Sequence, residues 1–177
     1  MKQSSCLRDY AKYSSLNILG MLGLSCYILA DTFFVSLAMG ADGLTALNLA
    51  IPVYSFIHGS GLMIGMGGGI RYSIFKSQGD ASRIFTGAVL LTVLIAAVFF
   101  LAGLFGSGFL IRLLGADDAI FQMGKTYLRV ILLFAPLFMT NNLLLCFIRN
   151  DGAPQLSMAA MITGSLSNVV LDYVFMF

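Results

Sequence analysis

Residues 84–110, IFTGAVLLTVLIAAVFFLAGLFGSGFL, form a continuous apolar run that contains no charged residue. A helix needs about 20 mostly apolar residues to cross the hydrocarbon core of a bilayer, and this run is long enough. Strands of a transmembrane barrel alternate apolar and polar residues with period two, and the run shows no such alternation. The stretch therefore predicts a transmembrane α-helix.

Four further runs of this kind lie on either side of it, separated by short polar or glycine-containing connections. The sequence therefore predicts an all-α integral membrane protein, with residues 1–12 as an N-terminal tail and residues 13–177 as the membrane part. The five predicted transmembrane helices cover residues 13–37, 44–70, 84–110, 128–148 and 156–177.

The composition agrees with a membrane protein and excludes several other classes. Of the 177 residues, 59% are hydrophobic and only 10% are charged, whereas a soluble domain carries roughly 25% charged residues. No basic, polar face typical of nucleic-acid binding is present. The chain has a single histidine and neither an HExxH nor a GxSxG motif, so we expect no enzyme. The three cysteines lack the paired spacing of a metal site.

The basic residues predict how the chain lies in a cell membrane. With a cytoplasmic N-terminus, seven lysines and arginines fall on the cytoplasmic side and three on the other, as the positive-inside rule requires. The cytoplasmic set is Lys2, Arg8, Lys12, Arg71, Lys76, Arg83 and Arg149, and the outer set is Arg112, Lys125 and Arg129. The chain stops within its last predicted helix, so we expect a truncated product or a fragment of a longer protein.

Two aspartates fall inside predicted helices, Asp31 in the first and Asp172 in the fifth. A charged side chain at mid-span costs about 2.5–3.5 kcal/mol on insertion scales, so an intramembrane carboxylate is a candidate functional group. Both helices run in the same direction, and at about 1.5 Å per residue the two carboxylates reach similar depth. Asn168 and Ser165 continue the Asp172 face toward the cytoplasm. We expect an oxygen-rich cluster for a sodium ion or a proton, or aspartates that only hydrogen-bond neighbouring helices or meet the interface.

Glycines and prolines in the predicted helices indicate close packing or bending. Gly61, Gly65 and Gly69 recur at spacing four in the second helix, and this spacing permits two helix backbones to approach closely. Pro52 and Pro136 each interrupt the pattern of a predicted helix and are candidates for bends.

Three polar side chains in the second and fourth predicted helices have two interpretations each. His58 is either a proton relay or a packed, hydrogen-bonded residue. Asn141 and Asn142 either face a substrate cavity or form hydrogen bonds across helices.

Several stretches together resemble the multidrug and toxic compound extrusion (MATE) family. They are ADTFFVSLAMGADGLTALNLAIPVYSF at 30–56, GLMIGMGGGIRYSIFKSQGD at 61–80, YLRVILLFAPLF at 127–138, RNDGAP at 149–154 and SLSNVVLDYVFMF at 165–177. The resemblance runs from about residue 7 to the end, and the order and spacing of the stretches carry it.

The resemblance implies a transporter of about twelve helices in two six-helix lobes, of which this chain is most of the N-terminal lobe. It implies export of small organic cations or drugs in exchange for sodium or protons. The family's cation site matches Asp31, Asn168 and Asp172 here. The implied partners are the lipid bilayer and the missing C-terminal lobe, and no cofactor beyond the coupling ion is expected. A truncated, non-transporting membrane protein and a flippase for lipid-linked substrates are the alternatives.

Overall fold

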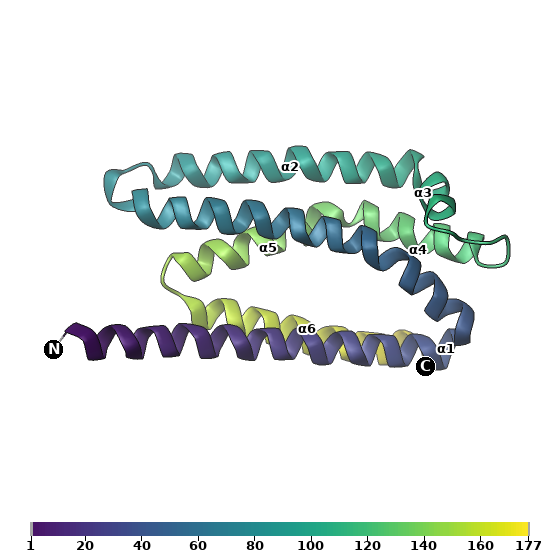
Figure 1. Cartoon of the computed structure of the whole chain (residues 1–177), viewed down its shortest axis with the longest axis horizontal. Coiled ribbons are helices and arrows are strands. Elements are labelled where there is room, and N and C mark those ends of the chain that lie inside the picture. The colour runs from purple at the N-terminus through teal and green to yellow at the C-terminus, as the bar shows by residue number, and fades with distance from the viewer. Residues whose placement is uncertain (1, 177) are drawn as a thin grey trace. The chain divides into compact units, whose positions relative to one another are not determined.

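The computed structural model describes residues 2–176, with the side chains of residues 2–6, 9, 78, 175 and 176 left aside. The described residues contain helices and no strand (Figure 1), which confirms the all-α prediction. The elements are α1 (Lys2–Phe75), η1 (Lys76–Gln78), α2 (Ala81–Phe105), α3 (Ser107–Leu113), α4 (Phe121–Leu133), α5 (Ala135–Asn150) and α6 (Pro154–Met176). Residues 1 and 177, the outer limits of the predicted tail and last helix, lie outside the described part.

Helix α1 consists of two helical stretches that meet at a break. The backbone of Gly40 has φ 64° and ψ −152°, which lies outside the helical region. An L-residue with a Cβ rarely adopts this conformation, and glycine does so easily. The break falls between the predicted helices 13–37 and 44–70, so Gly40 separates the two. Pro52 lies within α1 and keeps helical backbone angles, so the helix is not divided there, and the bend expected at this residue stays a prediction.

The number of transmembrane helices differs from the prediction of five. By length and apolar composition, two described segments are able to cross a membrane, Tyr10–Phe75 and Ala81–Phe105. A third span results if α4 and α5, which bend by 45°, are counted as one. The 66 residues of the first segment would extend about 100 Å as one straight helix, more than three times the bilayer core. Five spans are therefore not confirmed, although the all-helical architecture is.

Several helix boundaries in the structure also differ from the predicted ones. Residues 2–12, predicted as a tail, are already helical. The helix predicted at 84–110 is interrupted at Gly106, between α2 and α3. The helix predicted at 128–148 is divided at Phe134, just before Pro136 in the first turn of α5. Proline lacks the N–H needed for the helical hydrogen bond and clashes with the carbonyl four residues earlier, so it favours a division at this place.

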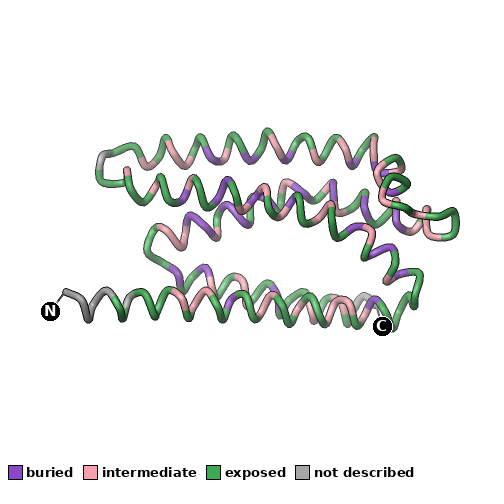
Figure 2. The backbone as a smooth tube through the Cα atoms, viewed as in Figure 1, coloured by how far each residue is buried: buried purple, intermediate pink, exposed green. Residues whose placement is uncertain are grey.

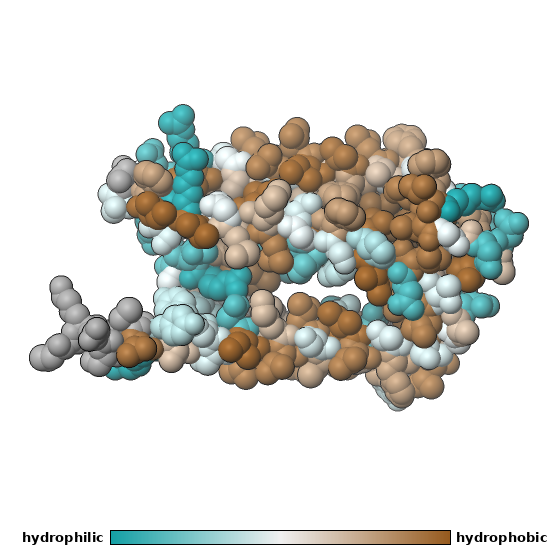
Figure 3. All heavy atoms as spheres, viewed as in Figure 1, coloured by the Kyte–Doolittle hydropathy of each residue, from teal (hydrophilic) through white to brown (hydrophobic). Residues whose placement is uncertain are grey.

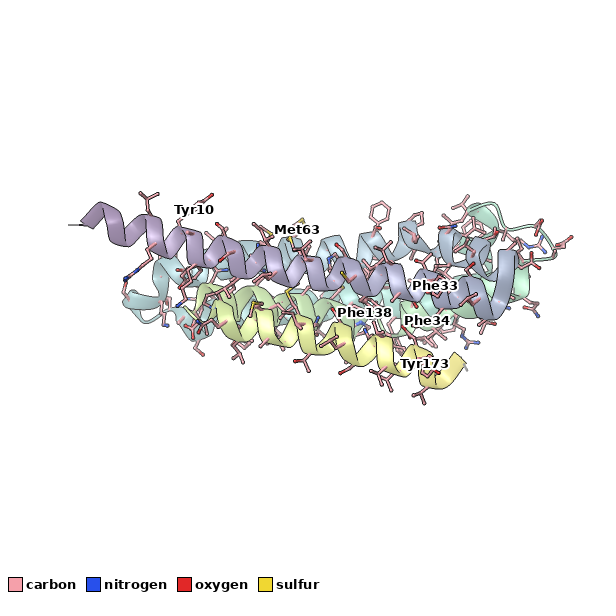
Figure 4. The ribbon with its side chains drawn as sticks, turned by 90° about the horizontal axis from the view of Figure 1, so that it is seen from below. Tyr10, Phe33, Phe34, Met63, Phe138 and Tyr173 are labelled. Carbon is pink, nitrogen blue, oxygen red and sulfur yellow. The ribbon has the colours of Figure 1, made fainter. Side chains whose placement is uncertain are left out.

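The chain divides into two compact units. Unit 1 comprises residues 1–38 and 152–177, and unit 2 comprises residues 39–151. In unit 1 the first part of α1 runs beside α6 (Figures 1 and 4). In unit 2, α2 packs against both α4 and α5.

The core of unit 2 uses small side chains on one face of α2. Ala88, Thr92, Ala96 and Gly103 are buried there, at spacings of four, four and seven residues (Figure 2). A Cβ on Gly103 would lie 2.7 Å from the Cβ of Leu132, so α4 approaches the α2 backbone closely. The hydroxyl of Thr92 donates to the carbonyl of Ala88 at 2.9 Å and is satisfied within the helix.

Large apolar side chains cover much of the outer surface. On α2, Leu90, Leu94 and Val98 are 64–67% exposed, on the side away from the small buried residues. The space-filling view shows apolar residues over most of the visible face (Figure 3). Such a surface is suited to lipid rather than water, because soluble monomers expose much smaller contiguous apolar patches.

Candidate functional site

The first part of α1 and α6 run parallel within unit 1. A Cβ on Gly20 would lie 3.1 Å from Sδ of Met161, and one on Gly23 would lie 3.5 Å from Cγ1 of Ile162. In both pairs the partners are about 140 residues apart in the sequence. Residue numbers therefore increase along both helices together, and the offset between contacting residues stays close to 140. The two helices run in the same direction with a fixed register.

This register brings Asp31 and Asp172 to the same level. The two acids are 141 residues apart in the sequence, the same offset as the contacting pair Gly20 and Met161. Their neighbours also meet, since the rings of Phe34 and Tyr173 have centroids 6.3 Å apart with a 56° angle between planes. Figure 4 shows both rings toward the same end of the two helices. The structure thus places the two acids at the same level of two parallel helices, and their role as an ion or proton site stays a prediction.

The environment of the acid pair is partly closed. Asp31 and Asp172 are both partly buried, and Oδ2 of Asp172 is buried without a hydrogen-bond partner among the described residues. Neither aspartate forms an ion pair with a described lysine or arginine. Two nearby carboxylates repel each other unless a proton or a cation lies between them. The arrangement is therefore able to accept one positive charge.

The structure does not bring Asn168 into this pair. Asn168 precedes Asp172 by one helical turn, but its side chain is exposed and forms no hydrogen bond to either aspartate in the described part of the chain. Ser165, on the same face, is buried. The site observed here is thus an acid pair, with Asn168 at its margin.

A second polar cluster lies inside unit 2, between α1 and α5. Nδ2 of Asn142 lies 3.0 Å from Nδ1 of His58 and 3.4 Å from the carbonyl oxygen of the same residue. The ring of Tyr54 stacks on His58, and Phe138 meets Tyr54 edge-on with centroids 5.6 Å apart. Asn142 is buried, whereas Asn141 is exposed. Of the two interpretations of Asn142, the structure shows the hydrogen bond across helices.

The glycine stripe of α1 lies directly against α5. A Cβ on Gly61 would lie 3.0 Å from Cα of Met139, and one on Gly65 would lie 3.1 Å from the carbonyl oxygen of Asn142. At Gly69, a Cβ would lie 2.7 Å from Nδ2 of Asn150. Each glycine thus faces α5 one turn further along, and at each one backbone or side-chain atoms of α5 lie within 3.3 Å of the Cβ position.

A charged cluster that the sequence did not indicate joins two connections of unit 2. Lys76 donates a hydrogen bond to Oδ1 of Asp151, and the hydroxyl of Tyr72 donates to the same oxygen at 3.1 Å. The hydrogen bond from Lys76 lowers the pKa of Asp151, and Tyr72 lowers it further. The same hydrogen bond raises the pKa of Lys76. Both residues were visible as charges in connections, but no local pattern pairs positions 75 residues apart.

Comparison with known proteins places this arrangement in a family. A profile described as MatE matches residues 17–174, which is most of the chain. The chain belongs to the MatE family. Among curated MatE relatives, the multidrug export protein MepA of Staphylococcus saprophyticus is 26% identical over 99% of this chain, and MepA of Staphylococcus aureus strain MRSA252 is 24% identical over 99%.

Solved MatE-like structures agree with the fold. The MATE multidrug transporter DinF-BH has a TM-score of 0.84 and 26% identity and covers 93% of this chain. A MOP superfamily transporter from Pyrococcus furiosus, whose binding pocket is described as reversed in polarity, has a TM-score of 0.82 and 27% identity and covers 94%. The chain spans 40% of the length of the two MepA relatives and 37–38% of these two structures.

Proposed function

We propose that this chain forms most of the N-terminal lobe of a cation-coupled exporter of small organic cations, with Asp31 and Asp172 as the coupling site. Membership of the MatE family and the multidrug export named for its relatives support the transport class. The observation that carries the site is the common level of the two acids on the parallel helices of unit 1, which follows from the contacts of Gly20 with Met161 and of Phe34 with Tyr173. Sodium and the proton are both compatible with it.

Five transmembrane helices with a cytoplasmic N-terminus are part of this proposal. The Gly40 break divides α1 into two stretches, each long enough to span a bilayer, and α2 supplies a third. The bent pair α4 and α5 supplies a fourth, and the 23 residues of α6 supply a fifth. The parallel direction of α6 and the first part of α1 supports an odd number of crossings between them, which is three here.

In this mechanism, one positive charge alternates between the acid pair and the aqueous phase. With both carboxylates ionised, their repulsion favours a conformation in which the helices separate or a cation enters. Binding of a proton or sodium from outside removes the repulsion and shifts the equilibrium toward another conformation. Release of an organic cation to the outside follows from that shift, with Asn168 next to the site as an additional oxygen donor for a bound ion.

The test is Asp31→Asn and, separately, Asp172→Asn, in the chain expressed within its own complete reading frame. Asp42→Asn is the matched control, because Asp42 is an exposed aspartate with no part in the pair. Transport is measured as uptake of a fluorescent organic cation into everted vesicles, in which the cytoplasmic face of the membrane points outward. It is driven in one series by a sodium gradient and in another by a pH gradient. We expect either pair variant to abolish gradient-driven efflux and the control to retain it. Undiminished efflux in Asp31→Asn contradicts the assignment, and the gradient that drives the wild type identifies the coupling ion.

A further inference from the structure

A groove between the second part of α1 and the start of α2 combines charge at one end with apolar walls. It lies wholly within unit 2 and has a volume of about 690 Å³. Arg71, Asp80 and Arg83 line the end next to the connecting turn. Further along the two helices its lining includes Met63, labelled in Figure 4, and Leu91.

The two arginines at this end are available to a ligand. Both are exposed, and neither forms an ion pair among the described residues. The guanidinium of Arg71 lies 5.8 Å from the centroid of the Phe75 ring, which supports it from one side. Asp80 precedes α2 and does not cap it with its side chain. The charged end of the groove therefore carries two positive charges and one negative charge.

Two glycines keep the apolar part of the groove open. A Cβ built on Gly67 of α1 or on Gly87 of α2 would meet nothing within 4 Å. Both residues line the groove. Met63 and Leu91 are 68% and 47% exposed, so their side chains form an accessible apolar wall. A ligand that fills this groove needs an anionic group at one end and an apolar chain at the other.

We propose that the groove binds an anionic phospholipid, with the phosphate at Arg71 and Arg83 and an acyl chain along the walls near Gly67 and Gly87. The guanidinium groups match phosphate oxygens in geometry as well as charge. Basic residues at the end of a membrane helix also attract anionic headgroups. A free phosphate would satisfy the arginines but leave the apolar walls uncovered, so the lipid is the better fit.

The absence of tryptophan from the sequence permits a direct reporter. Leu91→Trp places a single indole in the groove wall, and Leu90→Trp places it one residue away, at a position that is 65% exposed and outside the groove lining. Each variant is reconstituted in phosphatidylcholine with small amounts of brominated phosphatidylglycerol or brominated phosphatidylcholine. We expect selective quenching by the brominated phosphatidylglycerol at position 91 and equal quenching by both lipids at position 90.

Charge variants in the Leu91→Trp background test the headgroup contact. Each arginine is expected to contribute about fivefold in relative affinity, so Arg71→Gln with Arg83→Gln lowers the selectivity for phosphatidylglycerol over phosphatidylcholine by about 25-fold. Asp80→Asn removes the opposing charge and raises the selectivity. The matched control, Arg8→Gln with Lys12→Gln, removes two basic residues outside the groove and leaves the selectivity unchanged. Circular dichroism of each variant checks that the helical content is kept.

Three results would overturn the proposal. Equal quenching by both lipids at position 91 shows that the groove is not selective, or that another part of the protein covers it. Loss of the selectivity on addition of millimolar inorganic phosphate shows a phosphate site rather than a lipid site. An equal loss in the Arg8 and Lys12 control shows a general effect of charge. As a measurement without tryptophan, native mass spectrometry of the unaltered chain is expected to show phosphatidylglycerol retained, and the double arginine variant to lose it.

Discussion

The contact of the glycine stripe with α5 leads to a quantitative prediction about stability. Replacing Gly61 by alanine adds one methyl group, 3.0 Å from Cα of Met139 and 3.2 Å from Cβ of Asn142. A Cα atom belongs to the backbone, so it moves only if α5 as a whole moves. We therefore expect Gly61→Ala to force α1 and α5 apart, and Gly65→Ala to do the same through the carbonyl oxygen of Asn142 at 3.1 Å.

The magnitude follows from two opposing effects. Overpacking of a filled interior typically costs about 1–3 kcal/mol. Alanine in place of glycine within a helix returns about 1 kcal/mol through helix propensity. Gly59→Ala isolates the second effect, because Gly59 lies in the same helix and a Cβ there would meet nothing within 4 Å. The difference in unfolding free energy between Gly61→Ala and Gly59→Ala should therefore be about 1–3 kcal/mol, with Gly61→Ala the less stable.

The assay is reversible unfolding in mixed micelles by titration with a denaturing detergent, followed by far-ultraviolet circular dichroism. The wild type, Gly59→Ala, Gly61→Ala and Gly65→Ala are compared under identical conditions. We expect Gly59→Ala at or above the wild-type midpoint, and both stripe variants below it. Equal midpoints for Gly59→Ala and Gly61→Ala would refute the close contact, because only the contact distinguishes these two positions.

Three further predictions concern the connections, the α1 break and the buried asparagine. The hydrogen bond from Lys76 lowers the pKa of Asp151, so the pair stabilises the fold at pH values above the ordinary aspartate pKa of 3.8. This stabilisation is lost as the pH falls through the lowered pKa. The thermal unfolding temperature should therefore decrease below about pH 4 in the wild type, and Asp151→Asn should lack this contribution. Gly40→Ala should cost about 1–3 kcal/mol by backbone strain alone, measured as a lower unfolding midpoint, since no atom lies within 4 Å of the added methyl. Asn142→Ala should lower the free energy of unfolding by about 1–3 kcal/mol, because the hydrogen bond across the helices is lost. The control Asn141→Ala, at an exposed neighbouring position, should unfold like the wild type.

The helical class and the acid pair could be predicted because each depends on few variables. A run without charges, such as residues 84–110, has one stable form in lipid, since helices satisfy their own backbone hydrogen bonds. The similar depth of Asp31 and Asp172 needed only a common direction and a fixed rise per residue. Both predictions used properties of single helices.

Features that depend on contacts between helices could not be predicted from the sequence. Pro52 and Pro136 are the same residue in similar apolar surroundings, yet α1 continues through the first and the chain breaks before the second. Proline removes one hydrogen bond in either place, and the packing around it decides whether the helix also divides. The pairing of Lys76 with Asp151 and the exposure of Asn168 likewise depend on which helix faces which, and hydropathy carries no such information.

The two polar clusters, Asp31 with Asp172 and His58 with Asn142, differ in a way that bears on their roles. His58 and Asn142 complement each other, because the amide nitrogen of Asn142 lies within hydrogen-bonding distance of a ring nitrogen and of the carbonyl oxygen of His58. Asp31 and Asp172 are like-charged, and one buried oxygen of the pair has no hydrogen-bond partner in the described chain. Two carboxylates near each other repel unless a proton or a cation lies between them, so this pair is able to accept a positive charge. This difference supports the proposed placement of the coupling cation at the aspartates, whereas the contacts of the histidine cluster are those expected of a group that holds α1 against α5.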